Sequence, residues 1–349
     1  MVKKIAKNTI AVVVFMAASL AYLRRLLDLI IAGMRRFRWI AVACLMAGTW
    51  ARPDFSARPN ELGKVLILEY HLIAQESGRW SRSTAEFRRD LDLLYGSGYR
   101  TLALGDYIQG KIDIPAGTRP VIFTFDDSSP GQFRYRLRNG KKEIDPDCAV
   151  GLLMDFSRRH PDFGMKAIFF VLPGANEPHK LFGQPGYESD KLRELAALGF
   201  EIGNHTLWHA NLKRYDAAVV RKQLALAVAA IDAAVAGYKV HILALPFGAY
   251  PKDLAWAVSG SYGGVSYHND AILGVAGGPA PSPFSVSWDP LHLPRIQVVG
   301  QDLEKWIRYF DRHPGEVFIS DGKADTVAFP SGLGSDYASR FKGLRVAAY

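Results

Sequence analysis

The chain has 349 residues, of which 49% are hydrophobic, and a formal net charge of +9. Residues 1–51 hold eight basic residues and one acidic residue, so the remaining 298 residues carry only about +2. This nearly neutral body excludes nucleic acid as a partner, and its length and apolar content are sufficient for a large core.

Two apolar runs, at residues 10–23 and 39–50, dominate the leader, and each follows basic residues. Each is shorter than the ~18 residues that a membrane-spanning helix needs and has the length of a signal-peptide core. We therefore expect residues 1–51 to be an export signal or membrane anchor, with Met34 as a candidate true start. The body is then periplasmic, associated with the cell envelope or secreted, and any membrane association involves the N-terminus only.

A polar linker is expected at residues 52–63, and strand-like and helix-like segments alternate after it. Strands are expected over 64–70, 121–125, 166–172, 201–206, 241–247, 271–278, 295–300 and 316–321. Helices are expected over 83–98, 147–160, 189–199, 215–237 and 302–312, with serine caps on the first and the third. Apolar strands that alternate with amphipathic helices indicate a parallel sheet covered by helices. About seven such units favour a barrel over an open sheet.

Adjacent carboxylates follow one of these strands, in the run VIFTFDDSSPG at residues 121–131. Asp126 and Asp127 repel each other and are costly to bury, so a cation is the simplest explanation of the pair. In parallel α/β folds, sites gather at the carboxyl ends of the strands. Other polar residues that follow predicted strands, and so belong to the same rim, are Tyr70, His71, His205, His209 and Asp321.

His205 and His209, in the run GNHTLWH, are four residues apart. On a helical turn this spacing places both imidazoles on one face, where they can bind one metal ion. Two histidines and one carboxylate give three ligands and leave a coordination position open, as in a catalytic zinc site. We expect Zn²⁺ from the ligand types, with Co²⁺ or Ni²⁺ as alternatives.

These motifs resemble those of the polysaccharide deacetylases of carbohydrate esterase family 4. TFDD at 124–127, GNHTLWH at 203–209 and LPFG at 245–248 are similar to its first three motifs, and the similarity spans most of residues 64–321. The resemblance implies a distorted (β/α) barrel as the catalytic domain of residues 64–349. It also implies removal of N-acetyl groups from N-acetylglucosamine polysaccharides.

The resemblance also implies roles for the individual residues of these motifs. Asp127, His205 and His209 would bind the metal, and Asp126 would be the general base that activates the metal-bound water. A backbone N–H near Phe247 would hold the oxyanion, and Gly248 would allow close approach of the substrate.

Two departures from the family pattern leave roles open. Ala244 stands where an arginine usually orients the base, and we expect Arg295 of the LPRI segment to replace that arginine. The usual histidine general acid is also missing from its place near residue 320. The candidates for that role are His292, Asp321 and then His71.

Further substrate contacts are predicted from aromatic and strand-end residues. Trp80, Trp208, Trp288 and Tyr250 are candidates for stacking on sugar rings, with Trp208 favoured because it lies between two predicted ligands. Tyr70 and His71 are predicted substrate contacts on the rim.

Two other functions remain compatible with the sequence. One is an esterase that removes O-acetyl groups from a xylan-like glycan, since an ester needs less help at its leaving group. The other is a glycan-binding protein that keeps the metal but has lost turnover. The sequence leaves open the particular glycan and the oligomeric state.

Overall fold

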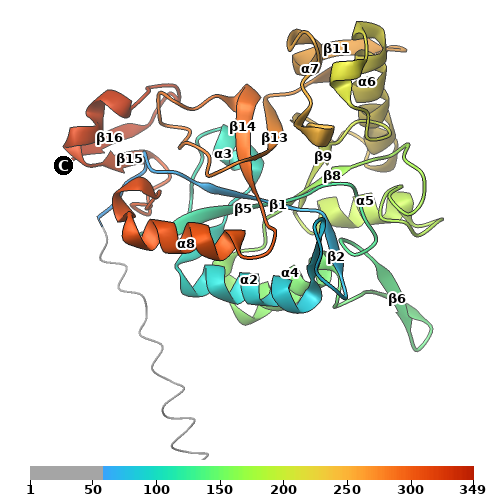
Figure 1. Ribbon diagram of the computed structural model, residues 1–349, viewed down its shortest axis with the longest axis horizontal. Helices are drawn as coiled ribbons and strands as arrows, with labels where there is room; N and C mark the ends of the chain where they lie inside the picture. Colours follow the sequence, from blue (N-terminus) through green and yellow to red (C-terminus); the bar gives the residue numbers. More distant parts are fainter. Residues whose placement is uncertain (1–57) are drawn as a thin grey trace, which may run out of the picture. The chain divides into compact units, whose positions relative to one another are not determined.

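The computed structural model describes residues 58–349, and its central feature is a closed ring of parallel strands (Figure 1). Within this range, seven strands pair side by side, and β1 pairs with both β5 and β14 to close the ring. The order around the ring is β1 (Leu66–Tyr70), β14 (Leu293–Gln297), β13 (Ala271–Gly277), β10 (Ile242–Ala244), β9 (Glu201–Asn204), β8 (Ile168–Val171) and β5 (Arg119–Phe125). The predicted (β/α) barrel is therefore confirmed.

Helices cover the outside of the barrel strands. They are α2 (Thr84–Gly96), α3 (Leu104–Ile108), α4 (Ala149–Arg159), α5 (Glu188–Ala197), α6 (Ala217–Ala234), α7 (Ala255–Val258) and α8 (Asp302–Arg312). Figure 1 shows α2 and α4 together on one side of the barrel and α6 with α7 on another. The strands are buried on both faces, as the continuous apolar runs predict; every residue of β1 and β8 is buried.

Local signals fix several helix ends. Ser83 caps α2 by accepting a hydrogen bond from the backbone N–H of Glu86, whose side chain accepts from the Ser83 N–H in return. This reciprocal capping box is the expected one. The serine cap predicted for α5 is wrong, because the helix begins one residue earlier than Ser189 and its N-cap is Tyr187.

The predicted strand at residues 316–321 is also wrong. Val317 and Ile319 form only isolated bridges, with Lys64 and Asn60. Those partners precede β1, so this apolar segment covers the amino-terminal end of the barrel. Its buried residues satisfy the hydrophobic pattern of a strand without joining the ring.

Short strands that the sequence analysis did not predict lie outside the ring of seven strands. They are β4 (Tyr99–Thr101), which pairs with β5, and the pairs β2 (Leu72–Ala74) with β3 (Ser81–Ser83), β6 (Tyr135–Arg138) with β7 (Lys141–Ile144), β11 (Ser259–Tyr262) with β12 (Val265–His268), and β15 (Thr326–Phe329) with β16 (Arg345–Ala348). Most have three or four residues, which is too short for a clear hydrophobic period.

The predicted export signal or anchor at residues 1–51 and most of the linker lie outside the described residues, so export remains a prediction. Between residues 58 and 349, no helix combines the length and the apolar character that crossing a bilayer requires. Cys148, the single cysteine in this range, is buried, as expected.

Candidate metal centre and cleft

The turn after β5 sends two neighbouring carboxylates in different directions. Asp127 and Ser128 both have positive φ, at 73° and 42°, so the chain turns sharply as it leaves the strand. Asp126 is buried inside the barrel, whereas Asp127 reaches the cleft. The Ser128 hydroxyl holds this turn by donating to the carbonyl of His179 and accepting from the N–H of Leu172.

Asp127, His205 and His209 converge on one point. The Nε2 atoms of both histidines lie 3.3 Å from Asp127 Oδ1, and the three potential ligand atoms lie within 4.8 Å of one another. The histidines follow β9 in a loop, so the predicted helical turn is wrong. Positive φ at Thr206 and His209 bends this loop and brings the two rings to 5.1 Å.

The donor set fits a divalent cation. His205 Nδ1 lies 2.8 Å from the carbonyl oxygen of Ala244, so Nδ1–H donates and the Nε2 lone pair faces Asp127. Asp127 Oδ1 is buried and accepts no hydrogen bond. A buried anionic oxygen between two imidazole lone pairs requires a cation, and the Asp–His–His set leaves coordination positions open, as catalytic zinc sites do.

The electrostatics of Asp127 and His209 agree with this fit. Burial alone would raise the pKa of Asp127, but the imidazoles of His205, and then of His71 and His209, hold that pKa below its usual range. Burial and the neighbouring His205 lower the pKa of His209 to about 4. Burial opposes a charged His205, yet the nearby carboxylates, Asp126 first, raise its pKa. Asp127 is therefore ionised and His209 neutral at pH 7, the forms that bind metals.

Asp126 lies next to the candidate metal ligands and is hydrogen-bonded to Arg295. The two Nη atoms of Arg295 donate to the two carboxylate oxygens at 2.8 and 2.7 Å, and Arg295 is itself fully buried. Burial would raise the pKa of Asp126, but Arg295 and then His205 lower it. Arg295 thus stands where the sequence analysis expected the residue that orients the base.

His71 follows β1 and lies at the same rim. Its Nε2 lies 3.5 Å from Glu69 Oε1, and its ring packs on Trp80 with centroids 5.0 Å apart. A ring nitrogen of His71 and the carboxylates of Glu69 and Asp126 lie within 4.8 Å of one another. The sequence analysis missed Glu69, although a carboxylate in the otherwise apolar run VLILEY signals a buried partner.

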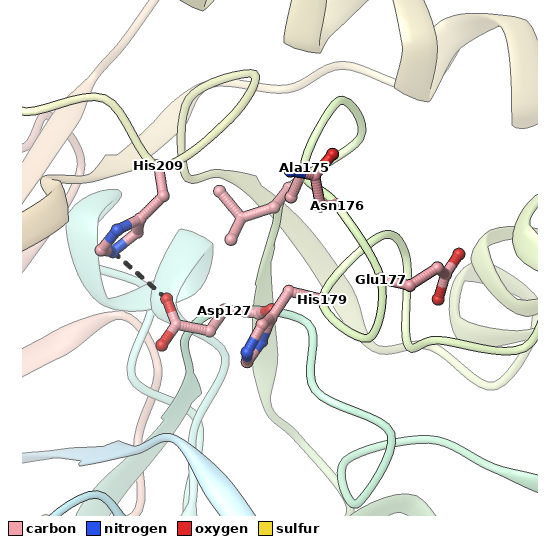
Figure 2. A pocket seen from close by; sticks show the side chains of 7 residues that line it. Asp127, Ala175, Asn176, Glu177, His179 and His209 are labelled. Atoms are coloured by element: carbon pink, nitrogen blue, oxygen red, sulfur yellow. Dashed lines mark hydrogen bonds and ion pairs between the residues drawn. The ribbon is translucent and has the colours of Figure 1, made fainter.

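A cleft of about 610 Å³ opens above these residues. It is lined by His71, Leu72, Trp80, Ser81, Asp127, Ser129, His179, His209, Phe247 and Val275. A smaller pocket of about 240 Å³ shares Asp127, His179 and His209 with it. Figure 2 shows this smaller pocket, with the His209 ring close to the Asp127 carboxylate and the loop that carries Glu177 and His179 forming the opposite wall.

Some predicted substrate contacts lie in the cleft. Phe247 has a φ of 60°, is 64% exposed, and lies edge-on to the His209 ring at 4.5 Å. Gly248 also has a positive φ, and a Cβ there would lie 3.1 Å from the Val275 backbone nitrogen, so this chain segment, rather than a substrate, requires glycine. Trp80 is the tryptophan that lines the cleft.

Trp208 and His292 do not line the cleft of the described chain. Trp208 is 41% exposed, and its backbone N–H donates to Gln223. His292 is exposed, pairs with Asp289 through Nδ1 at 2.7 Å, and stacks on Tyr250. The predictions for these two residues are therefore corrected: neither side chain is placed beside Asp127.

Tyr70 is a core residue and not a substrate contact. Successive strand residues point to opposite sides, so Glu69 faces the barrel interior and Tyr70 faces the helices. Tyr70 is 2% exposed and packs on Phe87 and Phe125 at 5.1 and 5.6 Å. Its hydroxyl donates to Asp90.

Asp321 lies at the wrong end of the barrel for the predicted acid. Its backbone N–H donates to Glu61, which precedes β1, and the neighbouring Ser320 N–H donates to Thr118, which precedes β5. Asp126 follows the opposite end of β5, a strand of seven residues. At about 3.3 Å per residue, roughly 20 Å separate the two ends.

Comparison with known families gives a match in the region that contains Asp127, His205 and His209. The model of the family described as polysaccharide deacetylase matches residues 113–263. This range contains Asp126, Asp127, both histidines and Phe247. No curated protein matches the chain.

Solved structures of deacetylases share the fold. The Streptococcus pyogenes deacetylase PplD, solved in complex with acetate, aligns with a TM-score of 0.54 at 19% identity, over 70% of this chain and 97% of its own. A putative polysaccharide deacetylase of Bacillus anthracis aligns with a TM-score of 0.51 at 17% identity, over 70% of this chain and 69% of its own. A polysaccharide deacetylase of Bacillus cereus gives 0.51 at 16% identity, with the same coverage.

Proposed function

We propose that this chain, a member of the polysaccharide deacetylase family through residues 113–263, is a metal-dependent hydrolase that removes N-acetyl groups from polymers of N-acetylglucosamine. The observation that carries the proposal is the convergence of Asp127, His205 and His209 at 3.3 Å beside a second, separately held carboxylate. A site that only bound a cation would have no use for a buried Asp126 fixed by Arg295.

A divalent cation, when bound by these three residues, supplies Lewis acidity toward water and the acetyl carbonyl. Asp126 accepts the proton of the attacking water, and Arg295 keeps that carboxylate ionised and aimed. The water oxygen bonds to the acetyl carbon, and the carbon–nitrogen bond breaks to give acetate and an amine.

The leaving nitrogen needs a proton, and His71 is placed to give it. Its ring lines the cleft and lies within reach of Asp126, whereas His292 lies outside the cleft and Asp321 lies at the other end of the barrel. A histidine in this position favours amide hydrolysis over the esterase alternative, because that alternative was favoured by the apparent lack of an acid. Trp80, which packs on His71, offers an apolar face for a sugar ring.

Acetate release from chitooligosaccharides tests the proposed function. We expect a chelator to abolish release and Zn²⁺ to restore it, because Asp127, His205 and His209 would hold the cation that activates the water. Acetylated xylan and peptidoglycan are assayed in parallel. Release from xylan alone would favour the esterase, zinc binding without release from any glycan would favour the binding protein, and release that survives chelation contradicts metal dependence.

His71→Ala is expected to lower kcat on the amide substrate by about 100-fold, the usual size of general acid catalysis. Hydrolysis of 4-nitrophenyl acetate should change little, because nitrophenolate leaves without a proton. His292→Ala is the matched control and should leave both rates near wild type. A larger loss in His292→Ala than in His71→Ala would show that the acid is assigned to the wrong histidine.

A further inference from the structure

Glu69 is a fully buried carboxylate whose two oxygens have different surroundings. Oε2 lies 3.4 Å from Arg295 Nε and accepts a hydrogen bond from the Ala276 N–H at 3.4 Å. Oε1 accepts no hydrogen bond, and His71 Nε2 lies 3.5 Å from it. An unpaired carboxylate oxygen in a barrel interior is costly, so this oxygen needs a partner, and His71 lies near enough to be one.

Arg295 does not account for Glu69. Both Nη atoms of Arg295 donate to the Asp126 carboxylate, and Nε donates to the Gly274 carbonyl at 2.8 Å. The bidentate pair with Asp126 is the strong one, and Glu69 receives only the longer contact. Arg295 would therefore keep its orientation toward Asp126 if Glu69 lost its charge.

The backbone also places the side chains of Glu69 and His71 on the same side of β1. Glu69 and His71 are two residues apart, so both side chains point to the inner side of β1 as it ends. Ala276 has a φ of 60°, where alanine is rare, at the irregular pairing of β13 with β14. From this segment the Ala276 N–H donates to Oε2, while Oε1 lies on the side of His71.

The groups that face Glu69 offer it one permanent positive charge. The charged groups that face it are Arg295, Asp126 and His71, and burial raises its pKa while Arg295 opposes that rise. Arg295 is one positive charge facing two carboxylates, Asp126 and Glu69.

We propose that Glu69 is a positioning residue that orients the His71 imidazole for proton transfer to the leaving amine. The inference rests on the proposed function. In the step itself, the carbon–nitrogen bond breaks, its electron pair takes the His71 proton, and His71 regains a proton from solvent. Glu69 does not touch the substrate and acts through His71.

The test compares an amide with an activated ester in Glu69→Gln, Glu69→Asp, His71→Ala and the double variant Glu69→Gln/His71→Ala. We expect Glu69→Gln to lower kcat on chitooligosaccharides by about 100-fold with a smaller change in KM, and to leave 4-nitrophenyl acetate hydrolysis near wild type. Glu69→Asp should recover part of the amide rate. The double variant should be no slower than His71→Ala, because residues that act as one unit are not additive.

Glu61→Gln is the matched control, since Glu61 is equally buried but accepts the N–H groups of Ala328 and Asp321 at the other end of the barrel. It should leave the ratio of amide to ester rates unchanged, and circular dichroism with zinc stoichiometry confirms folding in every variant. Equal losses on amide and ester in Glu69→Gln, no loss on either, or further loss in the double variant overturns the inference. A wild type that releases no acetate from any glycan overturns the proposed function as well.

Discussion

Asp126→Asn is expected to keep its zinc and to lose acetate release by ~10²–10⁴-fold, because the amide cannot accept the proton of the attacking water. Zinc should remain because both carboxylate oxygens of Asp126 accept hydrogen bonds from Arg295. Acetate release and zinc content, measured on the same preparations, check both halves of this expectation.

Asp127→Asn is the neighbouring control, because it removes a ligand and leaves the base. That variant should lose both zinc and activity, since Asp127 Oδ1 faces both imidazoles at 3.3 Å. The two adjacent carboxylates would then be separated by function. If Asp126→Asn lost zinc to the same extent, Asp126 would be a ligand and the assignment of the base would be wrong.

Arg295→Gln is expected to destabilise the fold by ~3–5 kcal/mol, the cost of removing one partner from a buried ion pair. Arg295 is fully buried and faces both Asp126 and Glu69. The loss should be larger at pH 8 than at pH 5, because protons can neutralise the stranded carboxylates at the lower pH. Urea unfolding at the two pH values measures the difference in free energy of unfolding.

The same variant should shift the pH dependence of catalysis. Arg295 lowers the pKa of Asp126 against the effect of burial, so its removal raises that pKa. The base must be ionised to accept a proton, and the acidic limb of kcat/KM therefore moves to higher pH. Arg295→Lys keeps a charge and should shift the limb less. An unchanged acidic limb in Arg295→Gln would contradict the assigned partnership.

The fold and the grouping of Asp127, His205 and His209 could be predicted because they leave local signals. Apolar runs of strand length recur between amphipathic helices, and α8 occupies the expected residues 302–312. Asp126 and Asp127 are conspicuous because adjacent acids follow a strand. The LPRI motif and the absence of an arginine at Ala244 predicted that Arg295 would orient Asp126. In the structure, Arg295 donates two hydrogen bonds to the Asp126 carboxylate.

The errors arise where local pattern carries no information on direction. Barrel strands are buried on both faces, so they show no alternation of apolar and polar residues. The sequence therefore does not reveal that Tyr70 faces the helices while Glu69 and His71 face inward. The run before Asp321 is apolar like a strand, but its pairing with Asn60 and Lys64 places it at the amino-terminal end. His205 and His209 have helical spacing, yet positive φ values in a loop bring them together.

Closure of the ring depends on strands from opposite ends of the chain. Leu68 of β1 pairs with Ile296 of β14, while its other neighbour in the ring is β5. Because β14 is among the last strands to be synthesised, the barrel cannot close on the ribosome until nearly the whole polypeptide has emerged. Contacts so distant in sequence slow folding, so the barrel stays open for longer than a fold built from local contacts would.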